Sequence, residues 1–205
     1  MKTIVIASSN PGKLREFEQM LAPLGIEIVP QSKLGIPEAG EPHATFIENA
    51  LAKARHASRL SRMAAFADDS GICVAALGGE PGVHSARFAG ESFAGSPGGD
   101  GSQDRRNNEK LIASLSGRAD RRAHYYCVIV LTRHADDPEP VLAEGRWHGE
   151  VIDTPRGTNG FGYDPYFYLP EFDRTAAELM SGEKNAASHR GKALAALIAQ
   201  LRSER

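Results

Sequence analysis

The chain has 205 residues, of which 41% are hydrophobic, enough to bury a substantial core as one large domain or as two lobes with a cleft between them. A formal net charge of −2 argues against the basic surface that nucleic acids and membranes require, although local cations can still bind a small anionic substrate. Both cysteines, Cys73 and Cys127, lie inside apolar runs without metal or redox spacing, which favours a reduced, cytoplasmic setting. The N-terminal apolar run, residues 4–7, is too short for a signal peptide or a membrane span.

The first part of the chain alternates predicted strands and helices. Continuous apolar runs indicate buried strands, and apolar residues at helical spacing indicate amphipathic helices. Strands are predicted over residues 3–7 and 26–29, helices over 12–22 and 44–62, and a loop over 31–43.

The second part of the chain combines strands that pair as a hairpin with two further helices. Residues 95–102 are so rich in Gly, Ser and Pro that we expect a mobile loop there. Helices are predicted over residues 108–115 and 190–201, and strands over 125–131, 141–147 and 166–168. This order predicts an α/β fold with a mixed sheet.

Two adjacent aspartates, Asp68 and Asp69, interrupt an apolar stretch and are followed by Ser70 and Gly71. A desolvated carboxylate is unstable unless a cation, a metal or several hydrogen bonds compensate it, so the pair has the character of a site. The alternative is an Asp-Asp-Ser-Gly turn in a hairpin, because all four residues favour turns. The pair alone does not decide between these two interpretations.

The loop over residues 8–13 is a candidate anion pocket. A buried strand, a loop of small residues and a helix that starts at Gly12-Lys13 together offer backbone N–H groups and a positive dipole end. The loop is not a P-loop, because the preceding glycine is missing and Leu14 replaces the metal-binding Ser or Thr. The alternative is an ordinary strand-to-helix loop that Asn10 caps.

Asn49 and Lys53, four residues apart on a predicted helix, can present a polar pair to the same phosphates, or they can form a solvated helix face. Glu41 and Glu48 are carboxylates upstream of the aspartates, and either can share a metal with them. Mg²⁺ is usually bound by one or two carboxylates together with the phosphate oxygens of a substrate.

The segment 157–165 combines glycines, two aromatic residues, an acid and a proline. Phe161 can stack on a base, and Asp164 can accept a hydrogen bond from a base or hold a neighbouring loop. A plain glycine loop before a strand is the alternative. Lys184, His189 and Arg190 place cations just before the last helix, where they oppose its dipole and do not serve stability.

These motifs occur together and in one order, and their joint pattern resembles the non-canonical purine nucleoside triphosphate pyrophosphatases, also called inosine/xanthosine triphosphate pyrophosphatases. The resemblance runs from residue 3 to about residue 200. The segments that carry it are Ser8-Ser9-Asn10-Pro11-Gly12-Lys13, Thr45-Phe46-Ile47-Glu48-Asn49-Ala50 with Lys53-Ala54, Asp68-Asp69-Ser70-Gly71, Pro81-Gly82-Val83-His84-Ser85-Ala86-Arg87, Phe161-Gly162-Tyr163-Asp164-Pro165 and Ser188-His189-Arg190-Gly191.

The resemblance implies one pyrophosphatase domain over residues 1–205, with a curved mixed sheet flanked by helices, two lobes and an active-site cleft, usually as a homodimer. It implies Mg²⁺-dependent hydrolysis of inosine, deoxyinosine and xanthosine triphosphates (ITP, dITP and XTP) to the monophosphate and pyrophosphate, which cleanses the nucleotide pool. Asp69 would be the proton acceptor, and Glu41 and Asp69 would bind the metal. The substrate-binding residues that the motifs imply are Ser8, Ser9, Asn10, Pro11, Gly12, Lys13, Lys53, Ser70, Phe161, Gly162, Tyr163, Asp164, Lys184, His189 and Arg190.

The chain departs from the family pattern at two places. Glu41-Pro42-His43 stands where the family commonly has Glu-Thr-Gly, so the acid is kept within a different loop. The glycine-rich stretch 95–102 is longer than the usual connection, which surface loops tolerate at small entropic cost.

The expected mechanism needs charge neutralisation, an aligned water and a base. The metal, Lys13 and Lys53, with a further contribution from Arg87, would neutralise the triphosphate, while Asp69 orients or deprotonates the water. Donors at the 6-oxo group of the base would exclude adenine. Two alternatives stay open: a pyrophosphatase with another base preference, such as a modified pyrimidine, and a nucleotide-binding sensor without turnover.

Overall fold

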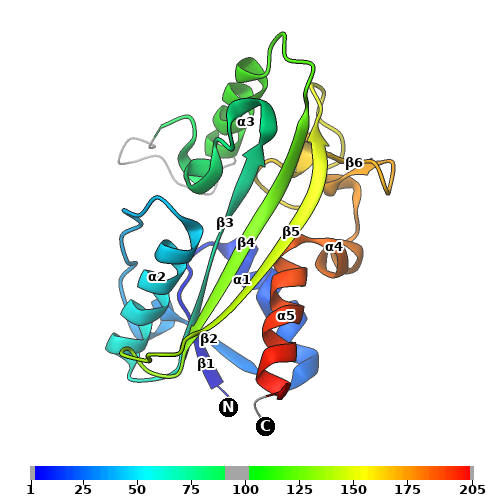
Figure 1. Ribbon diagram of the computed structural model, residues 1–205. Coiled ribbons are helices and arrows are strands. Elements are labelled where there is room, and N and C mark those ends of the chain that lie inside the picture. The colour runs from blue at the N-terminus through cyan, green and yellow to red at the C-terminus, as the bar shows by residue number, and fades with distance from the viewer. Residues whose placement is uncertain (1–2, 91–101, 204–205) are drawn as a thin grey trace. The chain divides into compact units, whose positions relative to one another are not determined.

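The computed structural model describes residues 3–90 and 102–203 (Figure 1). Within these residues, seven strands form one sheet in the order β2-β1-β3-β4-β5-β6-β7. β1 pairs in parallel with β2 and β3, whereas β6 pairs antiparallel with β5 and β7, so the sheet is mixed. The strands are β1 (Thr3–Ile6), β2 (Glu27–Pro30), β3 (Ala65–Val74), β4 (Arg122–Thr132), β5 (Val141–Val151), β6 (Phe167–Leu169) and β7 (Arg174–Thr175).

The α-helices are α1 (Pro11–Leu21), α2 (Phe46–Ser61), α3 (Ser102–Ser114), α4 (Ser181–Ala187) and α5 (His189–Ser203). Short 3-10 helices connect several elements, among them η2 (Gln31–Leu34) and η4 (Gly82–Arg87). The predicted α/β class with a mixed sheet flanked by helices is confirmed. None of the helices in the described residues is both long enough and apolar enough to cross a bilayer.

Three local expectations differ from the structure. The Asp-Asp-Ser-Gly segment is not a turn, because β3 runs without interruption from Ala65 to Val74. Helix α3 begins six residues before the predicted start at residue 108, since polar contacts described below hold its first turns in place of an apolar stripe. Helix α4 was not predicted. The expected mobile loop over 95–102 lies outside the described residues, apart from Ser102, where α3 begins.

The chain divides into two compact units. The first unit contains the chain up to Asp69, Cys127–Gly145, and the chain from His189 onward. The second unit contains Ser70–Tyr126 and Arg146–Ser188. Strands β3, β4 and β5 each contribute residues to both units. The predicted cleft between two lobes stays a prediction.

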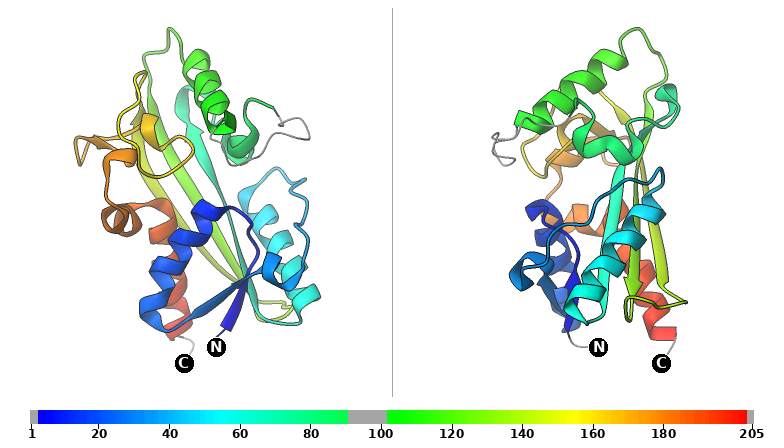
Figure 2. Two further views of the ribbon diagram at one scale, coloured as in Figure 1. Left: turned by 180° about the vertical axis from the view of Figure 1, so that it is seen from behind. Right: turned by 90° about the vertical axis from the view of Figure 1, so that its left-hand side faces the viewer.

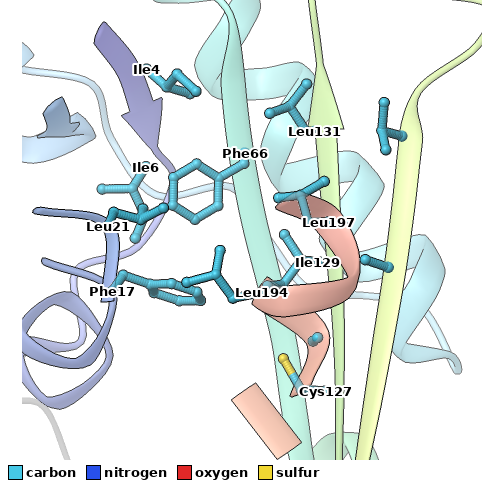
Figure 3. Packing of buried hydrophobic residues seen from close by; sticks show 13 residues of the cluster. Ile4, Ile6, Phe17, Leu21, Phe66, Cys127, Ile129, Leu131, Leu194 and Leu197 are labelled. Atoms are coloured by element: carbon cyan, nitrogen blue, oxygen red, sulfur yellow. The ribbon is translucent and has the colours of Figure 1, made fainter. Parts of the chain in front are cut away.

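The core of the first unit lies between the sheet and helices α1 and α5 (Figure 3). Phe17 of α1 packs edge-on against Phe66 of β3, with ring centroids 5.2 Å apart. Leu194 and Leu197 bring the apolar stripe of α5 to the same cluster, as the predicted amphipathic helix requires. Phe66 therefore marks the face of β3 that α1 and α5 cover.

The opposite face of the first unit's sheet is covered by α2. Side chains alternate between the two faces of a strand, so Ala65 and Ala67 point away from the face that Phe66 occupies. Ala50, Ala54 and Ala57 of α2 are fully buried, and such small residues allow the helix to approach the strands closely. Helices α1 and α2 lie on opposite sides of β1 (Figure 2).

The second unit has its own aromatic core. Phe167 contacts both Tyr125 and Trp147 edge-on, with centroid distances of 4.7 Å and 5.6 Å. Ile72, Leu111 and Leu179 bring β3, α3 and the segment before α4 into this cluster. The loop over residues 160–164, called the aromatic loop below, is anchored in this core, because Tyr163 is 4% exposed and belongs to the same cluster.

Candidate active site

The two aspartates of β3 point to opposite faces of the strand, because neighbouring side chains in a strand alternate. Asp68 shares the face of Phe66, toward α1 and α5. Its Oδ2 lies 2.9 Å from Lys13 Nζ of α1 and 3.4 Å from Arg190 Nε of α5. The side chain of Asp68 is fully buried. This carboxylate is therefore held between two cations that come from the ends of the chain.

Asp69 shares the face of Ala67, toward α2. Its Oδ1 lies 3.0 Å from Lys53 Nζ, and Asn49 Nδ2 donates to its Oδ2 over 3.4 Å. Lys53 Nζ also lies 2.7 Å from Glu41 Oε1, so a single ammonium group holds two carboxylates. The two adjacent aspartates thus have separate nearest cations, which reduces the repulsion between two neighbouring carboxylates in a mostly buried environment.

The same surroundings shift the pKa values of the two aspartates in opposite directions. Burial alone would raise the pKa of Asp68, but attraction to Lys13, Arg190 and Lys53 outweighs burial and holds the pKa well below its usual range. Burial raises the pKa of Asp69, and Glu41 adds to this rise, while Lys53 and Lys13 oppose it. A raised pKa suits a proton acceptor, so Asp69 has the chemical character of the base in this pair.

Helix α2 fixes the positions of Lys53 and of the Glu41 loop. Thr45 is its N-cap and accepts a hydrogen bond from the Glu48 backbone N–H. The Glu48 carboxylate accepts a hydrogen bond from the Thr45 hydroxyl over 2.6 Å, so it belongs to the cap of the helix. Of the two upstream carboxylates, Glu41 is the one that joins Asp69, through their shared contact with Lys53.

Asn49 holds the loop in which the chain departs from the family pattern. Its Oδ1 accepts the His43 N–H and its Nδ2 donates to the His43 carbonyl, both over 3.1 Å. Asn49 is 1% exposed, so the predicted polar pair of Asn49 and Lys53 does not form a solvated helix face. Asn49 instead keeps Glu41 and its loop beside the aspartate.

The loop over residues 8–13 is capped from within. Asn10 is the N-cap of α1, and its Oδ1 accepts the N–H groups of Gly12 and Lys13 over 2.9 Å and 3.1 Å. Ser9, Asn10 and Pro11 are exposed, while Ser8 accepts the Asn10 N–H over 3.3 Å. The capping alternative therefore describes the local geometry, and Lys13 provides the positive charge of this loop.

Arg190 and His189 begin helix α5 in the first unit. Arg190 is 2% exposed and is ion-paired with Glu16 of α1 as well as with Asp68. Glu16 was not predicted, although it follows Lys13 by one helical turn and so shares its face. A Cβ atom on Gly145 of β5 would lie 2.1 Å from the His189 carbonyl, so glycine allows the helix start to approach the strand.

The aromatic loop of the second unit is organised by Asp164. Its Oδ2 accepts the Phe161 N–H over 3.0 Å and lies 2.6 Å from Lys184 Nζ, and the Tyr125 hydroxyl donates to its Oδ1 over 3.4 Å. Asp164 and Lys184 are both almost fully buried, at 3% and 6% exposed. Lys184 Nζ also lies 5.0 Å from the centre of the Phe161 ring. The predicted residues Phe161, Asp164 and Lys184 thus form one group.

A model of the Ham1 family matches residues 4–200 of the chain. The chain belongs to the Ham1 family. A dITP/XTP pyrophosphatase of Ralstonia nicotianae is 63% identical, with 98% of each chain covered. A second, of Nitrosomonas europaea, is 61% identical and covers 98% of this chain and 95% of that relative. The solved structure of a HAM1 protein from Coxiella burnetii superposes with a TM-score of 0.87 at 43% identity and covers both chains completely.

The resemblance seen in the sequence is therefore confirmed, and so is the enzyme class: this Ham1-family chain is a pyrophosphatase, a hydrolase of phosphoanhydride bonds. The motifs that carried the resemblance lie in both units. Those with Lys13, Lys53, Asp69 and Arg190 belong to the first unit, and the aromatic loop with Lys184 belongs to the second.

The donor set around Asp69 fits a hard divalent cation. In the part of this Ham1-family chain that the structure describes, no group of three or more His, Cys, Asp or Glu side chains forms a cage for a metal. Glu41 and Asp69 nevertheless converge on one ammonium group, which shows that their oxygens can share a cation. Two carboxylates, completed by water and phosphate oxygens, are the ligands that Mg²⁺ commonly uses.

Proposed function

We propose that this chain hydrolyses the non-canonical purine nucleoside triphosphates ITP, dITP and XTP to the nucleoside monophosphate and pyrophosphate in the presence of Mg²⁺. The observation that carries the proposal is the group of Asp69, Lys53 and Glu41, in which one partly buried ammonium contacts both the carboxylate proposed as proton acceptor and a second carboxylate. The curated relatives of 63% and 61% identity, both dITP/XTP pyrophosphatases, support the choice of substrate.

The charge balance of this site supports a requirement for a divalent cation. Within the described residues, the ion-paired network of the first unit contains the cations Lys13, Lys53 and Arg190 and the carboxylates Glu16, Glu41, Asp68 and Asp69. Carboxylates outnumber cations, so the network alone does not attract a polyanionic triphosphate. Mg²⁺ bound by Glu41 and Asp69 would supply the missing positive charge to the phosphates.

In the proposed reaction the water oxygen forms a bond to phosphorus, the phosphoanhydride bond between the α- and β-phosphates breaks, and pyrophosphate leaves. Asp69 accepts the proton of the water at a carboxylate oxygen, and burial raises its pKa, which suits that task. Lys13 and Lys53 are the side chains that would bind the phosphates. Residues Ser8 to Gly12, which precede Lys13, and Ser70, which follows Asp69, are proposed to contact the substrate as well. Asp68 lies on the face of β3 opposite to Asp69, and its carboxylate holds the ammonium group of Lys13 in place there. Removal of Asp68 would thus act on the phosphate contacts, whereas removal of Asp69 would act on the chemical step.

We assign recognition of the base to Phe161, Asp164 and Lys184, with Gly162 and Tyr163 in the same loop, and to His189 and Arg190. A 6-oxopurine presents an acceptor at position 6 and a donor at N1, whereas adenine reverses both. A site whose donors meet the 6-oxo group therefore rejects adenine, because two donors would face each other. The ring of Phe161 supplies stacking that does not depend on the identity of the base.

A substrate panel tests the proposal directly. The purified protein is incubated with dITP, ITP, XTP, dATP and dGTP, with Mg²⁺ or with a chelator, and pyrophosphate and orthophosphate are measured separately. We expect kcat/KM for dITP to exceed that for dATP and dGTP by about a hundredfold or more, with pyrophosphate as the product and no turnover in the chelator. Equal rates on all purines, or orthophosphate as the main product, would contradict the assignment.

The remaining parts of the proposal are a homodimer and a cytoplasmic location, which the resemblance to this family of pyrophosphatases implies. Light scattering coupled to size-exclusion chromatography measures the mass in solution. A mass near twice 22.0 kDa is expected, and a mass near 22.0 kDa itself would contradict the dimer.

A further inference from the structure

Helix α3 contacts the aromatic loop through two polar side chains that the sequence motifs did not include. Gly162 N–H donates to Asp104 Oδ2 over 2.7 Å, and Asn108 Nδ2 donates to the Gly162 carbonyl over 2.9 Å. Both polar backbone groups of one loop residue are thus bound by side chains one helical turn apart. Asn108 also donates to the Asp104 carbonyl over 2.8 Å, which connects the two contacts within the helix.

These contacts lie directly beside the ring that is assigned to the base. The Phe161 N–H donates to Asp164, and the next N–H, that of Gly162, donates to Asp104. Two carboxylates from different elements therefore accept consecutive N–H groups of the loop. Hydrogen bonds to a charged acceptor are about twice as strong as neutral ones, so this arrangement fixes the backbone that carries the Phe161 ring.

A third polar side chain, on the same face of α3 because it follows Asp104 by three residues, ties the helix to η4 and fixes its position within the second unit. Asn107, 2% exposed, donates to the carbonyls of Ser85 and Ala86 over 3.3 Å and 3.1 Å. Tyr163 donates to the same Ser85 carbonyl over 2.8 Å. η4 in turn packs closely on β3, because a Cβ on Gly71 would lie 2.3 Å from the Gly82 carbonyl.

We propose that Asp104 and Asn108 are positioning residues for base recognition: they hold Gly162 from both sides and thereby set the place of the loop from which Phe161 stacks on the base and Asp164 directs its hydrogen bonds. The hydrogen bonds give the selectivity for the base, and the ring gives affinity. The inference rests on the proposed function, since it concerns the base of the same substrate. Neither residue takes part in the chemical step. Their loss is expected to weaken binding of the base and to leave the phosphate contacts of the first unit unchanged.

Two substitutions of Asp104 separate this role from a general loss of stability. Asp104→Ala removes the acceptor of the Gly162 N–H, whereas Asp104→Asn keeps an oxygen at the same place. For Asp104→Ala we expect KM for dITP to rise about tenfold with kcat little changed, and the preference for dITP over dATP to fall by a similar factor. Asp104→Asn is expected to restore most of both values.

Inorganic triphosphate, used as a competitive inhibitor, reports on the phosphate contacts alone. Its inhibition constant is expected to be unchanged in Asp104→Ala. Glu109→Gln provides the control on the same helix, because Glu109 is exposed and its partner is the exposed Arg105 at 3.4 Å. This variant is expected to match the wild type in KM, selectivity and inhibition.

Hydrogen exchange of the backbone amides gives a readout that needs no substrate. We expect faster exchange at residues 161–164 in Asp104→Ala and in Asn108→Leu, with near wild-type exchange in Asp104→Asn. A wild-type protein that shows no preference for dITP overturns the proposed function. The role of Asp104 is overturned if the wild type prefers dITP and the Asp104→Ala variant keeps the same preference. It is also overturned if amide exchange at residues 161–164 in that variant is as slow as in the wild type.

Discussion

The two groups of candidate site residues are built in different ways. In the first unit, Lys13, Lys53 and Asp69 project from helices and a strand, and each charge is balanced by an opposite charge within 3.0 Å. In the second unit, Asp164 and Lys184 form one buried pair, and the loop around them is fixed by hydrogen bonds to its backbone. The first group is a network of ion pairs, and the second is a loop whose backbone is fixed by hydrogen bonds.

This difference follows from what each group is proposed to bind. A triphosphate is recognised by charge, and flexible ammonium groups on rigid elements can move from carboxylates to phosphates. A base is recognised by shape and hydrogen-bond direction, so the backbone and ring that contact it must keep one position. Changes in the first group are therefore expected to lower kcat, and changes in the second to alter KM, selectivity and local stability.

The largest expected effect is on the chemical step. Asp69→Asn removes the proton acceptor, and kcat for dITP is expected to fall about 10²–10⁴-fold. Nucleotide affinity is expected to stay within a small factor, because Glu41 and the amide oxygen of the new side chain can still hold the metal. Single-turnover kinetics and equilibrium binding measure the two quantities separately. Asp136→Asn is a suitable control, because Asp136 is 88% exposed at its side chain. A near-normal kcat in Asp69→Asn would refute the role of this residue.

The next effect concerns the stability of the second unit. Asp164→Asn removes the carboxylate that lies 2.6 Å from the buried ammonium of Lys184, and the loss of one partner of a buried pair costs about 3–5 kcal/mol. Urea unfolding measures the change in the free energy of unfolding. Asp153→Asn is the control, since Asp153 is exposed and pairs with Arg121 over 2.8 Å, and exposed pairs contribute about 0–1 kcal/mol. Equal losses in both variants would show that burial of the pair has no consequence.

Two glycines of the aromatic loop form a matched pair. A Cβ on Gly160 would lie 2.0 Å from Asp164 Oδ2, whereas one on Gly162 has no atom within 4 Å, and both residues have positive φ. Gly162→Ala carries the backbone strain alone, about 1 kcal/mol, and Gly160→Ala adds displacement of Asp164. We therefore expect a lower melting temperature and weaker dITP selectivity in Gly160→Ala than in Gly162→Ala. Equal behaviour of the two variants would show that the position of Asp164 does not matter.

The smallest effect is expected from the ring itself. Phe161→Ala removes a stacking surface, a contribution of about 1–3 kcal/mol per base in nucleic-acid complexes, so KM for dITP is expected to rise about tenfold or more. Steady-state kinetics on ITP and dITP measures this change in KM. Phe161→Trp retains an aromatic ring, so its KM is expected to stay near the wild-type value. An unchanged KM in Phe161→Ala would remove this residue from the base site.

Much of the fold was predictable from local pattern. The apolar runs at residues 3–7 and 125–131 correspond to β1 and β4, and the helical stripe at 44–62 corresponds to α2, because burial of apolar side chains decides these elements. Helix α3 was predicted too short because its first turns are polar and depend on Asp104 and Asn108, whose partners lie more than 50 residues away. No periodic pattern records such contacts.

The sequence by itself determined which residue types are exceptional: acids inside an apolar strand, an aromatic residue among glycines, cations before a helix. Charged groups are costly to bury without partners, so these positions made a site one of two interpretations that the sequence left open. Only the tertiary structure decided the partners. Alternation along β3 sends Asp68 to Lys13 and Arg190, and Asp69 to Lys53 and Glu41, across separations of up to 122 residues. The sequence shows which side chains along one strand point to the same face, because they alternate. Which residues of distant elements they contact depends on how the helices and strands pack.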